Sequence, residues 1–169
     1  MISISRAVTT EHFQVMEAFG REVIPDVYVP YFPREWADYL VETGHTVPAL
    51  EGQAAAGYRH YLVFSENELA GYFAVHERGD GVMVLSHLYL REDFRGMGLG
   101  QVIMDFVHRD AAECGVRGIE LVVLRANRGA VSFYQRHGYV IEREVLTPMG
   151  PGAELEDYVM RKEMGGQGA

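Results

Sequence analysis

Cysteine and lysine are almost absent from this chain of 169 residues, which holds one of each, Cys114 and Lys162. A single cysteine excludes a disulfide within the chain and favours a reducing compartment. Cys114 falls at a helical core spacing, so we expect a buried, small apolar residue rather than a nucleophile. The seven histidines are scattered without metal-ligand spacing, and we expect no metal site.

Long apolar runs and an excess of basic charge are also missing. No apolar run approaches about 18 residues, and the first residues lack the apolar centre of a signal peptide. We therefore expect a soluble, cytoplasmic protein with no membrane partner. The 24 acidic residues outnumber the 15 basic ones, giving a net charge of −9. This balance argues against nucleic-acid binding and mildly favours cationic small molecules.

The composition that remains is typical of a folded domain. Hydrophobic residues make up 48% of the chain and charged residues 23%, close to ordinary globular usage. The length fits one domain with a real core. With no repeat or linker in between, we predict a single domain over residues 1–163 and a flexible tail over 164–169.

Helical patterns fill the first third of the chain after a short strand near residues 2–8. A helix is expected from Thr9 or Thr10, with Pro25, Pro30 and Pro33 breaking the chain into an aromatic loop. The next helix is expected from about Pro33, and a third over Val47–Ala56, stopped by Gly57. The face expected to be shared on the second helix contains Trp36, Tyr39, Leu40 and Thr43.

Strand patterns dominate from Arg59 onward, with two later helices starting near Gly98 and Asn127. The apolar run Ile119–Leu124 is of the type that is buried on both faces of a sheet. This order indicates a mixed α/β fold. The other predicted strands are Tyr61–Phe64, Leu69–Val75, Val82–Leu90, Tyr139–Leu146 and Leu155–Arg161.

The glycine-rich turn Arg95-Gly-Met-Gly-Leu-Gly100 joins a predicted strand to a predicted helix. Open N–H groups and the positive end of the helix dipole make such a turn a seat for phosphate oxygens. It lacks the Gly-Lys-Ser/Thr ending of a Walker loop, and its third glycine is one residue early for a dinucleotide fold. Glycines that simply turn the chain are the alternative, although glycine within a helix costs about 0.5–1 kcal/mol.

Three segments resemble the GCN5-related N-acetyltransferases (GNAT). Leu88–Gly100 resembles their acetyl-CoA signature, Arg/Gln-x-x-Gly-x-Gly/Ala, with Arg95, Gly98 and Gly100 at its positions. Asn127–Tyr139 resembles the second signature, Asn…Ala…Phe-Tyr…Gly-Phe/Tyr, and Asp157–Lys162 resembles the last strand of many members. The resemblance implies a single-domain fold with a central, mostly antiparallel mixed sheet of about seven strands and four or five helices.

The resemblance also implies an enzyme, an acyltransferase with acetyl-CoA as co-substrate. It implies that the backbone N–H of Leu88 polarises the thioester carbonyl as an oxyanion donor. It also implies that Tyr134 protonates the leaving thiolate. A buried aromatic is the alternative for Tyr134. The implied cofactor contacts are Leu88, Tyr89, Leu90, Arg95, Gly96, Met97, Gly98, Leu99, Gly100, Gln101, Asn127, Phe133 and Tyr134.

The acceptor and the general base stay open. Val84 and Ser86 stand where many members of the family place a Glu or His, and the base candidates are His76, Glu77, His87, Glu22, Asp26 or water. The acceptor is expected to be a small-molecule or peptide amine, with a homodimer left open. A non-catalytic acyl-CoA sensor and an enzyme for a longer acyl donor are the rivals. Residues expected to wall the acceptor, or else to cover the core, are Tyr28, Tyr31, Phe32 and Trp36, with Ser86 beside them.

Overall fold

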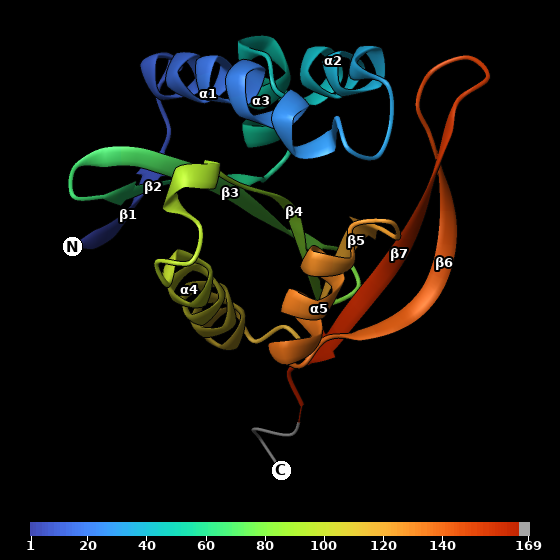
Figure 1. The fold of residues 1–169 in the computed structure, drawn as a ribbon. Helices are drawn as coiled ribbons and strands as arrows, with labels where there is room; N and C mark the ends of the chain where they lie inside the picture. Colours follow the sequence, from blue (N-terminus) through green and yellow to red (C-terminus); the bar gives the residue numbers. More distant parts are fainter. Residues whose placement is uncertain (166–169) are drawn as a thin grey trace. The chain divides into compact units, whose positions relative to one another are not determined.

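A computed structural model describes residues 1–165. In chain order these residues form β1 (Ile2–Ala7), α1 (Thr10–Tyr28), α2 (Arg34–Gly44), α3 (Val47–Ala55), β2 (Arg59–Ser65), β3 (Glu68–Arg78), β4 (Val82–Leu90), the short 3-10 helix η1 (Glu92–Phe94), α4 (Leu99–Cys114), β5 (Gly118–Leu124), α5 (Arg128–Arg136), β6 (Val140–Pro148) and β7 (Glu154–Glu163) (Figure 1). Part of the predicted tail, residues 166–169, lies outside this range.

The seven strands form one sheet in the order β1-β2-β3-β4-β5-β7-β6. Strands β1 and β2, β2 and β3, β5 and β7, and β6 and β7 pair antiparallel, whereas β4 pairs parallel with β5. The predicted mixed, mostly antiparallel sheet with five helices is therefore confirmed.

The chain divides into two compact units. The first contains Met1–Val75 and His87–Val102, and the second contains His76–Ser86 and the chain from Ile103. Strands β3 and β4 and helix α4 each contribute residues to both units. The single domain over residues 1–163 stays a prediction, and each unit is described by itself.

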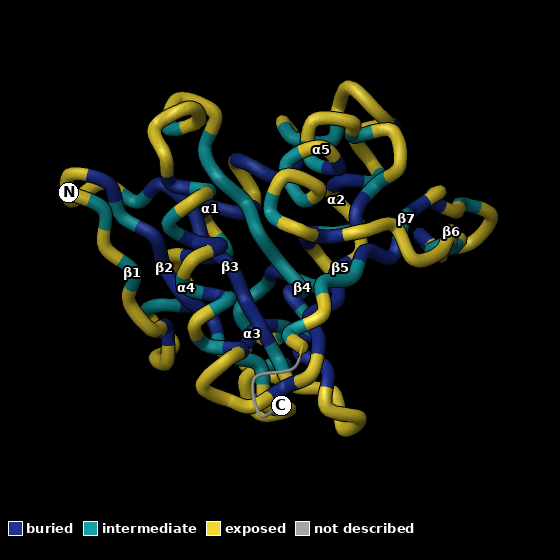
Figure 2. Tube along the Cα trace, turned by 90° about the horizontal axis from the view of Figure 1, so that it is seen from below, coloured by how far each residue is buried: buried dark blue, intermediate teal, exposed yellow. Residues whose placement is uncertain are grey.

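Helices α1, α2 and α3 of the first unit lie together (Figure 1). Phe13, Met16 and Phe19 recur along α1 at helical spacing and pack with Leu50 of α3 and Tyr72 of β3. Strand β3 is almost wholly buried over Ala70–Val75, as Figure 2 shows. Burial of these side chains, each worth about 1.5–3 kcal/mol when complete, holds the helices on the strands.

Two predictions about the first helices were wrong. Helix α1 continues through Pro25 to Tyr28, so Tyr28 is a helical residue and not part of a loop. Proline removes only one hydrogen bond there, close to the helix end, and the carbonyl of Pro25 still accepts from the N–H of Val29 at 2.9 Å. On α2 the buried residues are Ala37 and Val41, so the predicted aromatic face is not the one that packs inward.

The second unit corrects two more predictions. Cys114, the last residue of α4, is exposed, because the buried stripe of that helix, which includes Ile103, Val107 and Ala111, ends before it. Strand β5 is not buried along the whole of both faces, since Val122 is 56% exposed. On the same face, the buried Glu120 lies between Arg78 and Arg161.

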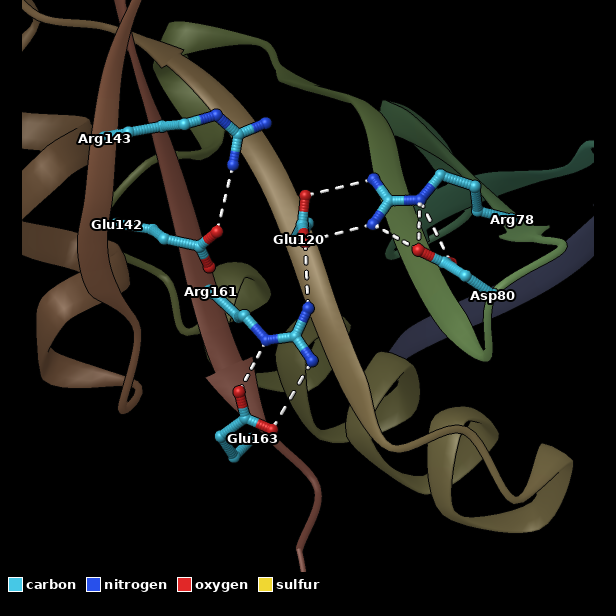
Figure 3. Close-up of polar contacts among 7 residues, drawn as sticks. All are labelled: Arg78, Asp80, Glu120, Glu142, Arg143, Arg161 and Glu163. Carbon is cyan, nitrogen blue, oxygen red and sulfur yellow. Dashed lines mark hydrogen bonds and ion pairs between the residues drawn. The ribbon is translucent and has the colours of Figure 1, made fainter.

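Glu120 is the centre of an ion-pair network in this unit (Figure 3). Arg78 donates to both carboxylate oxygens of Glu120 at 3.1 Å, and Arg161 donates to Oε2 at 2.9 Å. Asp80 and Glu163 pair with the outer sides of these arginines. The hydrogen bonds from Arg78, and to a smaller extent the one from Arg161, lower the pKa of Glu120. The carboxylate therefore stays charged although the residue is buried.

Candidate active site

The glycine-rich turn opens α4, as predicted. Gly96 and Gly98 have φ angles of +77° and +82°, which side-chain-bearing residues rarely adopt. A Cβ on either glycine would meet nothing within 4 Å, so the backbone faces open space. The first intrahelical bond runs from the N–H of Val102 to the carbonyl of Gly98 at 3.2 Å. The N–H groups of Leu99 and Gly100 precede it, which is the arrangement that binds anions.

The end of β4 runs directly over Gly71 of β3. A Cβ on Gly71 would lie 2.3 Å from the carbonyl oxygen of Tyr89 and 2.6 Å from the Leu90 side chain. Just beyond it, the N–H of Arg91 donates to the carbonyl of Ala70 at 2.8 Å. The absence of a side chain at Gly71 therefore lets Leu88, Tyr89 and Leu90 take their places before the turn.

The predicted acceptor aromatics lie partly together in the first unit. The hydroxyls of Tyr28 and Tyr89 are 3.2 Å apart, and the Tyr28 ring stacks on Phe32 with centroids 5.0 Å apart. The ring centroids of Trp36 and Phe32 are 5.8 Å apart. Phe32 is buried and belongs to the core, whereas Tyr31 is exposed. Tyr28 and Tyr31 therefore differ in how far their side chains are exposed to solvent.

Gln53 of α3 joins two histidines that the sequence did not connect. Its Nε2 donates to the carbonyl of Gly44 at 2.9 Å, so its Oε1 can only accept. That oxygen lies 2.9 Å from Nε2 of His60 and 3.1 Å from Nε2 of His87. Both imidazoles must therefore carry hydrogen on Nε2, which leaves Nδ1 as the basic nitrogen of each ring.

His45 and Tyr72 form a buried pair beside this group. The hydroxyl of Tyr72 lies 2.5 Å from Nδ1 of His45, and the His45 ring is 4.5 Å from the ring of His87. Burial lowers the pKa of His45 to about 4 and, with the charge of Arg6, that of His60 to about 4 as well. Both buried rings are neutral at neutral pH.

The remaining base candidates lie in different surroundings. In the first unit, Glu22 pairs with Arg91 at 2.6 Å, and Asp26 is exposed at the surface of α1. In the second unit, burial lowers the pKa of the half-buried His76, and Glu77 is exposed. Ser86 is half-buried on β4.

Helix α5 holds the second set of predicted residues. Asn127 caps the helix, its Oδ1 accepting from the N–H of Ala130 at 3.2 Å. Tyr134 is half-buried, with its ring edge-to-face on Tyr139 at 5.8 Å and on Phe133 at 5.3 Å. Tyr139 is buried, and its hydroxyl lies 3.1 Å from Nε2 of His108. Tyr134 is thus partly exposed to solvent, whereas Tyr139 is buried.

Residues 21–139, more than half of the chain, match the model of the Acetyltransferase (GNAT) family. The chain belongs to this family. The predicted family is therefore confirmed, and with it the general class of N-acetyltransferase.

Solved GNAT structures share the fold over nearly the whole chain. PaiA N-acetyltransferase from Thermoplasma acidophilum, in complex with coenzyme A, superposes with a TM-score of 0.80 at 19% identity, covering 96% of this chain and 99% of that one. The ribosomal-protein-S18-alanine N-acetyltransferase from Escherichia coli gives 0.75 at 14% identity, covering 100% and 99%. At such identities the likeness shows the fold alone.

A curated relative matches a shorter segment. The protein named uncharacterized N-acetyltransferase ycf52-like, from Prochlorococcus marinus, is 43% identical over 49 residues. These residues are 29% of this chain and 26% of that protein, so the match spans about a quarter of the relative.

Residues 1–165 contain neither a membrane-spanning helix nor a metal-binding cluster. None of the helices in this range is long and apolar enough to cross a membrane. Within the same range, His, Cys, Asp and Glu side chains form no group of three or more that could hold a metal ion. No local motif marks the four residues of the histidine cluster, because each meets its partner across separate elements. They are Gln53, His45, His60 and Tyr72.

Proposed function

We propose that this GNAT protein transfers the acetyl group of acetyl-CoA to the amine of a small molecule or peptide, by direct attack in a ternary complex. The observation that carries the proposal is the turn at the start of α4. Its exposed glycines at positive φ and its leading N–H groups suit a pyrophosphate. Acetyl-CoA would supply the thioester whose cleavage drives the transfer.

The turn would hold the pyrophosphate through backbone N–H groups over 96–101, since the N–H of Arg95 donates to the carbonyl of Glu92 at 3.0 Å. Because the first turn of α4 lies at the positive end of the helix dipole, each phosphate charge is stabilised there. The exposed Arg95 would add charge from the rim. Leu88, Tyr89 and Leu90 would pair with the pantetheine arm through backbone groups, and Asn127 and Phe133 would complete the cofactor contacts from α5.

Two groups would act on the reacting atoms. The N–H of Leu88 would donate to the thioester oxygen as it gains negative charge, and one such donor is worth about 3–4 kcal/mol in comparable sites. Tyr134 would protonate the departing thiolate with its hydroxyl. Its partial exposure on α5 fits a residue that must approach a ligand.

The ammonium form of the acceptor must also lose a proton. Among the first-unit candidates we favour His87 over Glu22, because Gln53 fixes the His87 ring through Nε2 and leaves Nδ1 as its basic nitrogen, whereas the Glu22 carboxylate is engaged by Arg91. Tyr28, Tyr31 and Ser86 would contact the acceptor, and the buried Phe32 would support the Tyr28 ring on which it stacks. The face of a tyrosine ring can bind a cation, and this cation–π interaction contributes about 2 kcal/mol when water is excluded.

A release assay tests the proposal. Purified protein is incubated with acetyl-CoA and a panel of amines: polyamines, amino acids, aminoglycosides and peptides with free N-termini. Free thiol and acetylated amine are then measured. We expect equal amounts of both with at least one amine. If coenzyme A binds but no amine is acetylated, the protein is a non-catalytic acyl-CoA binder, and a preference for longer acyl donors would correct the donor alone.

A further inference from the structure

A groove of about 530 Å³ lies in the second unit, beside α5. We call it the α5 groove. Val131 and Gln135 line it from the helix, Ile141 from β6, and Glu156 and Tyr158 from β7. Arg125, Ala126 and Arg128 close it around the start of the helix. None of these residues belongs to the sites assigned above.

Two arginines, Arg125 and Arg128, lie at one end of the groove. Among the residues that the structure describes, no carboxylate pairs with Arg128. Arg125 meets Glu144 at 3.6 Å, but these side chains are 49% and 64% exposed, and such a surface pair holds its partners weakly. The Arg125 guanidinium lies over the Tyr158 ring at 5.9 Å, which orients it beside the groove.

The rest of the groove combines apolar and hydrogen-bonding surface. Ile141 is 40% exposed although it is a large aliphatic residue, and the buried Val131 and the half-buried Tyr158 continue that surface. Gln135 and Glu156 add acceptors for an N–H donor. A ligand that matches all three features has an acidic group, a small apolar body and an amide or amine.

The acidic group is better matched by a carboxylate than by a phosphate. Guanidinium groups bind both in a planar, two-pronged fashion. Glu156 shares the groove with the two arginines, however, and it repels a doubly charged phosphate more than a singly charged carboxylate. The chain as a whole also carries a net charge of −9, so any attraction for an anion must come from this local pair.

We propose that the α5 groove binds the carboxylate-bearing part of the acceptor, which makes amino acids or short peptides the acceptor class. This inference rests on the proposed function. Arg128, Val131 and Gln135 are spaced three and four residues apart and share one face of α5. Tyr134 stands beside that face, so an acceptor in the groove lies next to the helix that carries the proposed acid.

Binding can be tested without turnover by using an acetylated product. N-acetyl-L-leucine and its uncharged partner N-acetyl-L-leucinamide are titrated into the full chain and followed by NMR chemical shifts. We expect the carboxylate to bind at least about tenfold more tightly than the amide. Arg128→Ala and Arg125→Ala should each remove most of this preference, and Arg128→Lys should restore part of it.

Arg136→Ala is the matched control, because Arg136 lies on the same helix and donates to the Ser132 hydroxyl at 2.9 Å outside the groove lining. It should leave the preference unchanged. Thermal melting confirms that each variant is folded. Equal binding of acid and amide, no binding of either, a preference that survives Arg128→Ala, or tighter binding of inorganic phosphate than of the carboxylate would each overturn the proposal.

The proposal for the groove and the proposal for the enzymatic function can be refuted independently. If N-acetyl-L-leucine binds as expected and no amine is acetylated, the groove stands and the enzymatic role is wrong. If leucine and leucinamide are acetylated with equal kcat/KM, and Arg128→Ala changes neither, the enzymatic role stands and the groove does not select the acceptor.

Discussion

A Cβ added to Gly71 would lie only 2.3 Å from the carbonyl oxygen of Tyr89. That carbonyl belongs to the backbone, so no side-chain rotation can relieve the clash. The strand that would hold the pantetheine arm therefore depends on a glycine of the neighbouring strand.

Gly71→Ala should lower the free energy of unfolding by about 2–3 kcal/mol, as overpacking does in dense interiors. It should also lower kcat/KM, because the end of β4 must move. Urea denaturation measures the first effect. Gly129→Ala is the control: a Cβ there meets only Asn127 Oδ1 at 3.9 Å, so it should be neutral or stabilising. Equal stability of Gly71→Ala and the native chain would refute the close approach.

Tyr134→Phe should lower kcat at least about tenfold if its hydroxyl protonates the thiolate. The KM for acetyl-CoA should change little, since the ring stays in place. Tyr139→Phe provides the comparison, because it removes a buried hydroxyl that lies against His108 and should reduce stability but not kcat. A native kcat in Tyr134→Phe would remove the acid role.

Glu120→Gln should destabilise the fold by about 2–3 kcal/mol, because it leaves Arg78 and Arg161 without the carboxylate between them. The pKa of Glu120 is held below its usual 4.5 by those arginines, so its contribution is present above pH 4.5 and is lost as pH falls through the lowered value. Glu163→Gln should destabilise the fold far less than Glu120→Gln, because the Glu163 side chain is 68% exposed and its ion pair is screened by water. Chemical denaturation measures the free energy of unfolding of both variants. Equal destabilisation by the two substitutions would argue against a central role for Glu120.

His45 and His60 should make the fold sensitive to mild acid. Each has a pKa of about 4 in the fold, against an ordinary value of 6.5. Their contribution is therefore complete above pH 6.5 and is lost as pH falls from 6.5 toward 4, because the unfolded chain binds the protons first. Between pH 7 and 5 each site should account for about 2 kcal/mol. His60→Gln should flatten this dependence in urea titrations; an unchanged slope would contradict it.

Local signals predicted most helices and strands and the glycine-rich turn at the start of α4. The turn between β2 and β3, for example, places Glu66 and Asn67 at φ +50° and +68°, and the predicted strands on either side of it indicate a hairpin turn from sequence. The glycines before α4 and the Asn127 cap are equally local. Such features depend on neighbours a few residues away, which the sequence shows directly.

Features that depend on distant partners were missed or predicted wrongly. On α2 the aromatic residues gave the stronger pattern, yet the small Ala37 and Val41 pack inward. The pairing of His45 with Tyr72 spans 27 positions and that of Arg78 with Glu120 spans 42. Neither has a spacing that a single sequence reveals, because only the pairing of strands and helices brings the partners together.

Calorimetric titration of acetyl-CoA into Gly98→Val shows whether the turn before α4 holds the cofactor. Gly115→Val is the matched control: Gly115 has φ +70°, against +82° at Gly98, and a Cβ at either position meets nothing within 4 Å. Both variants should therefore carry similar backbone strain. We predict that Gly98→Val loses binding by more than about 100-fold while Gly115→Val binds as the native chain does. Native affinity in a folded Gly98→Val variant would show that this turn does not hold the cofactor.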